Sequence, residues 1–578
     1  MKKLLFAGLL LAAAGAGAWF LTQDKAGVAA PADNDLLTYV PADTIFFSGS
    51  LEPLPTEQYV NLMQQYGIFS DGDLMLQAGA EADPSAPAGV KLLTALYHDY
   101  LGAMADPEML REQFGFADPV NMAAYTVGVV PVLRIALADE GTFAGLLDSH
   151  EQKLDIAADQ ETLQGTTYRS YALSEEPEMQ GYRLIVGHHE GYMVMALDTP
   201  LEDSVDLAPA LGAVKPAASL AGTDTLTALA AKYDYLASNL TYLDHVAIAE
   251  GITRPESNGF GQMLSALLRH HGDQNPFAGI QNESCHADIT GLVGNWPRLV
   301  AGNTTLDDDG MSGSIILEGA NPELLRDLAK IRGHIPDAIM ADDFAFSFAL
   351  GLKMDAIAPY LTKVWRDFTT ATYQCEPLVA MQASAKESNP AMLGAMTGMM
   401  SGVRGVAIGL MDLELEETVP GAGPQPKSAD LVVTFTVEDP QAFLSVMAMM
   451  QPALAELAIE DGGEPVTLPD SLATGLDVKI AQRGQNLIVY TGPGSAGKLP
   501  EFAGSPDPEA NGLMAFSMNA TKYFGFLSQV LDSMPEGTIE QEERQTLEKL
   551  KNMKGFFSSS LDVTDEGVIS TMDMQMAE

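Results

Sequence analysis

The order of apolar and polar positions along the chain shows a small set of recurring segments. The segment PVLRIALADEGTFAGLLDS, which starts at Pro131, has an apolar strand pattern, an acidic turn and then apolar residues at positions i, i+3 and i+4. An acidic residue in such a turn can cap the helix that follows. The segment GYRLIVGHHEGYMVMAL, from Gly181, has two apolar runs around a short polar turn, which is typical of a β-hairpin. These patterns predict an α+β fold of antiparallel β-hairpins with packed helices.

The same segments occur a second time, in the same order, later in the chain. The offsets between the first three pairs are 295, 298 and 295 residues, and chance similarity would not keep them so nearly constant. A fourth pair has an offset of 255 residues, so the second copy is shorter, and we expect its missing residues to correspond to part of the helical stretch 225–290. The sequence therefore predicts a tandem duplicated module, with a first copy at 35–332 and a shorter second copy at 333–578. The pairs start at Tyr39 and His334, Pro131 and Ala429, Gly181 and Leu476, and Gly302 and Phe557.

The N-terminus, MKKLLFAGLLLAAAGAGAWFL, has two lysines followed by an uninterrupted apolar run from Leu4 to Leu21. A helix over this run would be about 27 Å long, close to the thickness of the hydrocarbon core of a membrane. Because the lysines favour a cytoplasmic N-terminus, we expect the rest of the chain to lie in the periplasm, anchored in the inner membrane. The sequence predicts a signal anchor at 1–23 and a tether at 24–34, and a cleaved signal peptide is the alternative.

The charge of the chain is strongly one-sided. It has 31 Lys and Arg residues against 78 Asp and Glu residues, a formal net charge of -47. A surface this acidic repels nucleic acids and anionic lipid head groups. We therefore expect no nucleic-acid partner.

Cys285 and Cys375 are the two cysteines of the chain. In an oxidising envelope an even pair is a candidate disulfide, which would stabilise the fold by closing a long loop. The alternative is two buried free thiols. We expect no catalytic role for Cys285, because the neighbouring His286 is adjacent in sequence only.

A glycine-rich stretch near the C-terminus has the spacing of a phosphate-binding loop in Gly492, Gly497 and Lys498. The next residue is Leu499, where such a loop needs Ser or Thr to hold magnesium, so we expect no nucleotide to bind there. Ser495 and Lys498 also match the S-x-x-K spacing of penicillin-binding enzymes, but the partner motifs of those enzymes are absent. We expect the glycines to form a flexible link after the outgoing strand of a hairpin.

His188, His189 and Glu190 are candidate metal ligands at a predicted hairpin turn. Adjacent residues of a strand point to opposite faces, so at most one of the two histidines can join any one site. A zinc or copper site would need about three ligands from different loops to converge, and we assign no metal. The other candidates are His270, His271, Asp273, His286 and Asp288.

Two acidic turns, Asp307–Gly310 and Asp562–Gly567, have some features of calcium-binding loops. Asp and Gly between two strand patterns are also standard residues of a hairpin turn. We favour the hairpin at both positions, and calcium binding is the alternative.

Met392, Met396, Met399 and Met400 fall on one face of a predicted helix, at positions i, i+4, i+7 and i+8. This pattern is typical of a core face that is filled by a flexible side chain. The alternatives are an adaptable hydrophobic groove for a lipid, peptide or partner helix, and copper(I) binding by the thioethers.

The start LTYVPADTIFFSGSLEPLP, together with Cys285 and the later Pro297-Arg298-Leu299, resembles a family of uncharacterised envelope proteins of Gram-negative bacteria. The resemblance implies an envelope location and carries no known activity, so it transfers no catalytic residue. We therefore expect a membrane-tethered periplasmic protein that binds or scaffolds a partner protein or a hydrophobic ligand, with no catalytic residue or cofactor assigned. The alternative is an envelope hydrolase or metal-dependent enzyme whose site is assembled from dispersed residues.

Overall fold

A computed structural model gives the fold of the chain as two compact units. Unit 1 is Met1–Asp307 with Gln374–Pro377, and unit 2 is Asp308–Tyr373 with Leu378–Glu578. The predicted modules, 35–332 and 333–578, are defined by sequence correspondence and stay a prediction. The structure describes residues 34–65, 85–104, 106–176, 179, 181–201, 207–272, 275–307, 310–388, 398, 400–415, 426–469, 476–503, 508–532 and 554–575.

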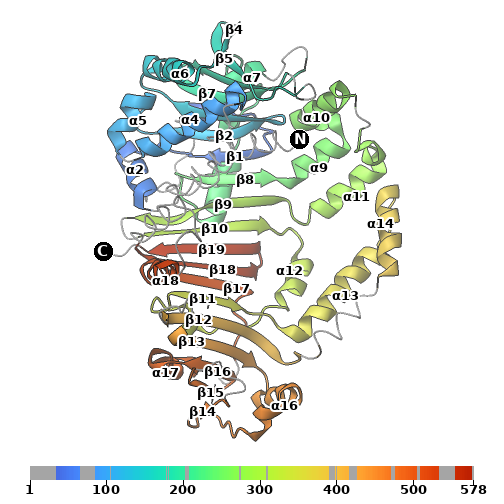
Figure 1. The fold of residues 1–578 in the computed structure, drawn as a ribbon. Helices are drawn as coiled ribbons and strands as arrows, with labels where there is room; N and C mark the ends of the chain where they lie inside the picture. Colours follow the sequence, from blue (N-terminus) through green and yellow to red (C-terminus); the bar gives the residue numbers. More distant parts are fainter. Residues whose placement is uncertain are drawn as a thin grey trace. The chain divides into compact units, whose positions relative to one another are not determined.

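Unit 1 is built on an antiparallel sheet with helices packed against it (Figure 1). Its strands, in spatial order, are β4 (Asp159–Leu163), β5 (Thr166–Ala172), β6 (Arg183–His189), β7 (Tyr192–Asp198), β3 (Val130–Ala136), β2 (Met122–Val127), β1 (Phe46–Gly49), β8 (Leu240–Asp244) and β9 (Arg298–Asp307). Its helices are η2 (Asp35–Tyr39), α2 (Thr56–Gln65), α4 (Ala88–Ala103), α5 (Pro107–Phe114), α6 (Glu140–Leu154), α7 (Leu207–Leu211), η4 (Leu220–Gly222), α8 (Thr225–Tyr233), α9 (His245–Thr253), η5 (Pro255–Ser257), α10 (Gly259–His270), η6 (Ala278–Ile280) and α11 (Glu283–Val293).

Unit 2 is also built on antiparallel strands (Figure 1). Its strands, in spatial order, are β14 (Val466–Thr467), β15 (Val478–Arg483), β16 (Asn486–Thr491), β13 (Pro426–Val437), β12 (Val403–Leu415), β11 (Phe346–Leu350), β17 (Met514–Asn519), β18 (Phe556–Thr564), β19 (Gly567–Gln575) and β10 (Gly310–Glu318). The helices placed between these strands along the chain are α12 (Pro322–Ala329), η7 (Asp337–Met340), α13 (Met354–Thr370), α14 (Glu376–Glu387), α16 (Pro440–Met450), η8 (Pro452–Glu456), α17 (Pro493–Lys498), η9 (Leu499–Phe502) and α18 (Ala520–Asp532).

The strands of the two units lie in the same order. Unit 1 reads β5-β6-β7-β3-β2-β1-β8-β9, and unit 2 reads β14-β15-β16-β13-β12-β11-β17-β18, with equivalent strands also in the same chain order. The predicted α+β class with antiparallel hairpins is therefore confirmed.

After β7, two connections of unit 1 are longer than the equivalent connections of unit 2. The connection from β7 to β8 covers 199–239, whereas the equivalent connection from β16 to β17 covers only 492–513. The connection from β8 to β9 covers 245–297, whereas that from β17 to β18 covers only 520–555. The predicted omission within 225–290 is therefore only part of the difference, because the connection before β8, which begins with α7 and η4, is longer in unit 1 as well.

The local signals in the sequence act as predicted at the turns and caps. Asp139 caps α6 by accepting a hydrogen bond from the N–H of Gly141, and Asp439 caps α16 in the same way. The β6–β7 hairpin turns through Glu190 and Gly191, both at positive φ (48° and 80°), which is the backbone of a two-residue hairpin turn.

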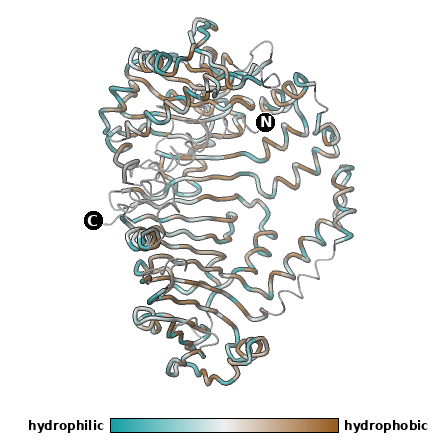
Figure 2. Tube along the Cα trace, in the orientation of Figure 1, coloured by the Kyte–Doolittle hydropathy of each residue, from teal (hydrophilic) through white to brown (hydrophobic). Residues whose placement is uncertain are grey.

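Apolar side chains close each sheet against its helices. In unit 1, Phe47 of β1, Tyr125 of β2 and Leu184 of β6 are buried. In unit 2, the core includes Ile488 and Phe502, which pack around β16 and η9. Figure 2 shows apolar and polar residues interspersed along the strands of both units, as expected for sheets with one face turned to a core.

Within the described residues, no helix is both long enough and apolar enough to cross a membrane. The predicted signal anchor at 1–23 lies outside the described residues, as does the tether up to residue 33. The described part of the chain begins at Asn34, which is buried in unit 1 and donates hydrogen bonds to the carbonyls of Ser50 and Leu51.

Candidate functional site

The glycine-rich stretch after β16 forms helix α17, so the prediction of a flexible link is wrong. Asp430 of β13 lies at the N-terminal end of this helix, where its Oδ1 accepts a 3.1 Å hydrogen bond from the N–H of Ser495. A Cβ atom on Gly492, whose φ is +91°, would lie 2.0 Å from the same oxygen. Only glycine fits there, and a carboxylate distant in sequence stabilises the first turn of the helix.

The same geometry shows what Ser495 and Lys498 do. The carboxylate of Asp430 occupies the place that a phosphate takes in a phosphate-binding loop. Lys498 Nζ lies 2.5 Å from Asp343 and 2.9 Å from Glu501. Burial lowers the pKa of Lys498, but the hydrogen bonds to these two carboxylates outweigh it, and its pKa lies above the usual value. Ser495 is fully buried, so neither residue is placed as in an acylation dyad.

The candidate ligands at the β6–β7 turn diverge to separate partners. His188 Nδ1 lies 2.9 Å from Glu140, on helix α6. His189 Nδ1 lies 2.8 Å from the hydroxyl of Thr166, on strand β5. Glu190 accepts a hydrogen bond from the hydroxyl of Tyr39. The turn is a hairpin whose polar residues fasten it to neighbouring elements.

Of the other candidate ligands, His270 and His271 contact each other edge to face, with ring centres 5.6 Å apart. His271 Nε2 lies 2.8 Å from the hydroxyl of Tyr182, and the two rings stack. His286 Nδ1 lies 2.8 Å from the hydroxyl of Thr253. Asp273 lies outside the described residues. Among the residues that the structure describes, no group of three or more His, Cys, Asp or Glu side chains converges on one point.

The acidic turn of the second copy is a hairpin turn. Strands β18 and β19 pair up to Thr564 and Gly567, so the turn between them has two residues. Asp562 forms a bidentate ion pair with Arg332, at 2.6 and 2.5 Å, so its oxygens are occupied. In the first copy, part of the turn Asp307–Gly310 lies outside the described residues.

The cysteine prediction is confirmed, because Cys285 and Cys375 form a disulfide with an S–S distance of 2.06 Å. Both residues are fully buried. Asp288, on the same helix as Cys285, accepts hydrogen bonds from the N–H groups of Gln374 and Cys375, at 2.6 and 2.8 Å. The disulfide and this carboxylate together hold residues Gln374–Pro377 on α11 of unit 1.

The predicted methionine face is mostly untested. Met392, Met396 and Met399 lie outside the described residues. Met400 lies in a turn before β12 and is 37% exposed. The hydrophobic groove stays a prediction at this position.

A buried arginine that the sequence pattern did not single out lies in the core of unit 1. Arg134 of β3 is fully buried and donates hydrogen bonds to the hydroxyl of Tyr125 at 3.2 Å and to the carbonyl of Ala210 at 3.0 Å. Its guanidinium lies 4.3 Å from the ring centre of Tyr39. Its Nη1 finds no hydrogen-bond acceptor among the described residues, so the aromatic ring supplies the compensating interaction on that side.

Tyr39 is the last residue of η2, and its hydroxyl group has a partner as well as its ring. Its hydroxyl donates a hydrogen bond to Glu190, and Lys215 Nζ lies 4.4 Å from the ring centre. Burial raises the pKa of Tyr39, and the hydrogen bond to Glu190 raises it further, so the phenol stays protonated. These contacts fasten the first described segment of the chain to β3 and to the β6–β7 turn.

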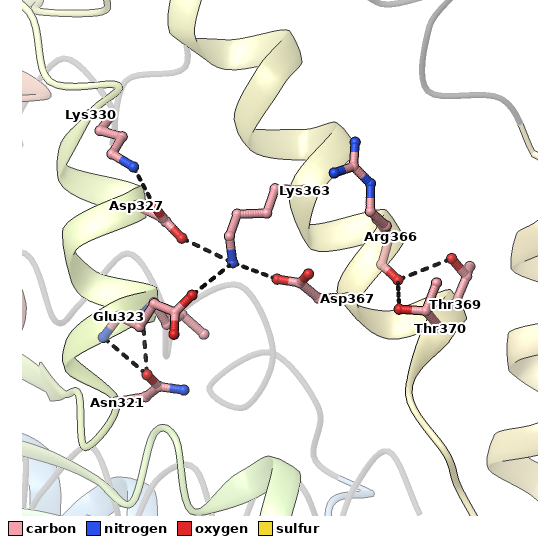
Figure 3. A network of polar contacts seen from close by, with 10 residues as sticks. Asn321, Glu323, Asp327, Lys330, Lys363, Arg366, Asp367, Thr369 and Thr370 are labelled. Atoms are coloured by element: carbon pink, nitrogen blue, oxygen red, sulfur yellow. Dashed lines mark hydrogen bonds and ion pairs between the residues drawn. The ribbon is translucent and has the colours of Figure 1, made fainter.

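A polar network joins two helices of unit 2. Figure 3 shows Lys363 of α13 between Asp327 and Glu323 of α12, at 3.0 and 3.5 Å, and Asp367 of its own helix, at 2.7 Å. Lys330 lies 2.6 Å from Asp327. The hydrogen bonds from Lys330 and Lys363 hold the pKa of Asp327 below its usual value. Each charge in the network has a partner, and we interpret it as a structural link between α12 and α13.

One exposed apolar surface of unit 2 lies at the end of α16. Met449 is 77% exposed and Met450 is 57% exposed. No residue of α16 is buried, although Phe443 and Leu444 pack against the sheet. This surface was not predicted from the sequence, although the run MAMM at 447–450 is visible there.

The equivalent helix of unit 1 is covered. Helix α6 follows β3 as α16 follows β13, and its Phe143, Leu147 and His150 are buried. His150 Nε2 lies 3.0 Å from Asp99 of α4. Counted from the capping aspartates, His150 corresponds to Met450. The same helix position is thus an internal polar contact in unit 1 and an exposed apolar side chain in unit 2.

Comparison of the chain with protein-family models, with curated proteins and with solved structures finds no match. The candidate function therefore rests on the geometry of the chain itself, in which Met449 is the most exposed of the large apolar residues given for the described chain.

Proposed function

We propose that this chain is a periplasmic binding protein without catalysis, anchored in the inner membrane by residues 1–23. We further propose that it arose by tandem duplication of one module, and that the two copies have taken different roles. The first copy holds the chain near the membrane, and the second offers a surface to a partner protein. The identical strand order of the two units supports the duplication.

The observation that carries the binding role is the exposure of Met449 and Met450. Two adjacent methionines with such large exposed fractions leave apolar area in water, which is unfavourable unless a partner covers it. Methionine is flexible and polarisable, and it is over-represented at adaptable binding surfaces. A small hydrophobic ligand would instead need a concave site that buries most of its surface. A helix end with side chains projecting into solvent suits a protein partner better.

The contacts of Tyr39 support the holding role of the first copy. A tether over 24–34 can span at most roughly 40 Å when fully extended. Because Arg134 and Glu190 fasten Tyr39 shortly after the tether, unit 1 would stay within that distance of the membrane. The partner of unit 2 would then be another envelope protein.

The alternative prediction, a hydrolase or metal-dependent enzyme, has no support in the described residues. Ser495 is buried, and Lys498 is bound to Asp343 and Glu501. The histidines at 188 and 189 have separate partners.

The test is site-specific photo-crosslinking in the native cells. A photoreactive phenylalanine derivative replaces Met449 in the full chain, and cross-linked peptides are identified by mass spectrometry. We expect position 449 to cross-link to one defined segment of another envelope protein.

Two matched positions serve as controls. Ser149, the equivalent of Met449 in α6, should cross-link only within its own chain. Met381 of α14 is 60% exposed but lies outside the α16 surface, and it should not yield the same product. Cross-links from position 449 that stay within the chain would contradict the proposed function, and so would a product shared with position 381.

A further inference from the structure

The methionines at the end of α16 carry exposed sulfur atoms in a chain that has no free thiol. Both cysteines of the sequence are in the disulfide, and both are fully buried. The sulfur groups that an oxidant in solution can reach are therefore the thioethers of methionine. Met449 and Met450 keep 77% and 57% of their surface exposed, which makes them neighbouring targets at one helix end.

Two other methionines of the described chain have the opposite surroundings. Met193 of β7 and Met263 of α10 are each only 3% exposed. The sulfur of Met263 also accepts a 3.3 Å hydrogen bond from the N–H of Val129, so one of its lone pairs is occupied. Because oxidation requires contact between the sulfur and the oxidant, the fold protects these two side chains and leaves Met449 and Met450 open.

The end of α16 can become more polar without a change in the core of unit 2. The helix packs on that core through Phe443 and Leu444, which lie in its first half, and none of its residues is buried. Its N-terminal cap is the carboxylate of Asp439, at the opposite end from the exposed methionines. An oxygen atom added to the sulfur of Met449 or Met450 therefore lies in water and displaces no buried contact.

We propose that Met449 and Met450 form a reversible oxidation site for small peroxides. The thioether sulfur attacks one oxygen of hydrogen peroxide, so that an S–O bond forms and the O–O bond breaks. The proton on the transferred oxygen passes to the departing hydroxide, and the products are methionine sulfoxide and water. The sulfur loses two electrons and the peroxide gains them. The reaction converts an apolar surface into a polar one, and methionine sulfoxide reductases reverse it.

The test treats the full chain, in nanodiscs of saturated lipid, with isotopically labelled hydrogen peroxide. The label distinguishes this oxidation from oxidation during sample handling, and peptide mass spectrometry follows the sulfoxide fraction at each methionine with time. We expect oxidation at Met449 and Met450 to be at least roughly tenfold faster than at Met193 and Met263. In denaturant these rates should converge, because unfolding exposes every sulfur. Two reductases, one for each sulfoxide epimer, should then restore the thioethers of the folded chain.

Two variants serve as matched controls. Leu147→Met places a methionine at a buried position of α6, the helix equivalent to α16, at nearly constant volume. It should be oxidised as slowly as Met193. Met449→Leu combined with Met450→Leu keeps the α16 surface apolar but removes its thioethers, so the intact mass should gain two fewer oxygen atoms in the fast phase than the wild type does.

The outcomes decide the inference independently of the proposed function. Oxidation at Met449 and Met450 that is no faster than at Met193 overturns it, and so does a difference in rate that persists in denaturant, because the fold would then not be its cause. Sulfoxides that the two reductases leave unchanged would contradict reversibility. The inference concerns the chain without a partner. Its failure would leave the proposed function untouched, because partner binding needs the apolar side chains and not their oxidation.

Discussion

Helices α6 and α16 follow equivalent strands and are capped by Asp139 and Asp439 in the same way, but their last turns lie in different environments. In α6, Leu147 and His150 are buried, and His150 contacts Asp99 of α4. In α16 the last two residues are exposed methionines. The comparison teaches that the strand order and the cap preserve the placement of the helix, while the residues on its outer face decide whether it belongs to the core or to a surface.

The interiors of the two units differ at an equivalent strand position too. Arg134 lies opposite the third residue of β7, and Thr434 lies opposite the third residue of β16. Both side chains are fully buried. The arginine has an aromatic ring and two hydrogen-bond acceptors, whereas the hydroxyl of Thr434 finds no partner among the described residues. At this position, the buried guanidinium of Arg134 links parts of unit 1, whereas the buried hydroxyl of Thr434 has no partner among the described residues of unit 2.

The largest expected effect on stability comes from replacing each of these two buried polar side chains by an apolar one. Arg134→Leu leaves the Tyr125 hydroxyl and the Ala210 carbonyl without their donor and opens space beside Tyr39, so we expect a loss of about 3 kcal/mol in the free energy of unfolding. Thr434→Val removes an unsatisfied hydroxyl at nearly constant volume, so we expect a gain of up to about 1 kcal/mol. Denaturant unfolding of the full chain measures both. If both changes alter the free energy of unfolding by the same amount, Arg134 does not stabilise unit 1 in the way that the comparison implies.

A smaller effect is expected from the partly exposed polar link between α12 and α13 of unit 2. Lys363→Gln removes the ammonium between Asp327 and Asp367, and we expect a smaller loss of stability than for Arg134→Leu because solvent screens the network. The pKa of Asp327 is lower in the folded chain than its usual 3.8, so its contribution is present above that value and is lost as the pH falls through the folded pKa. Unfolding measured near neutral pH should separate the variant from the wild type, and the two should converge in acid. A difference that grows on acidification would show that the carboxylate does not act through its charge.

The smallest effect tests the exposure of α16 itself. Met449→Gln combined with Met450→Gln should change the free energy of unfolding by less than about 0.5 kcal/mol, because exposed side chains contribute little to folding. Leu147→Gln in α6 buries an amide in a core position and should cost about 2 kcal/mol or more. Thermal unfolding of both variants makes the comparison. A large loss from the methionine changes would mean that the native chain covers these side chains, and α16 would then resemble α6.

Much of the local structure could be read from short-range patterns. The acidic turns before the helices, the β-hairpin in the segment from Gly181, and the pairing of two cysteines depend on residue type and spacing, and the structure confirms each of them. The turn at Gly492–Lys498 was predicted wrongly because the residue that stabilises α17, Asp430, lies on another strand. The candidate metal ligands could not be judged from spacing either, since their partners come from other elements.

The sequence by itself determined the alternation of strands and helices, the repetition of that order in two copies and the cysteines available for a bridge, because each of these depends on local periodicity or composition. Only the tertiary structure decided that Arg134 would be buried against Tyr39, that Asp430 would occupy a helix terminus, and that Met449 would remain exposed where α6 is covered. The physical reason is that burial and pairing depend on which elements pack together. The same apolar and polar pattern along a helix is compatible with a covered face and with an open one.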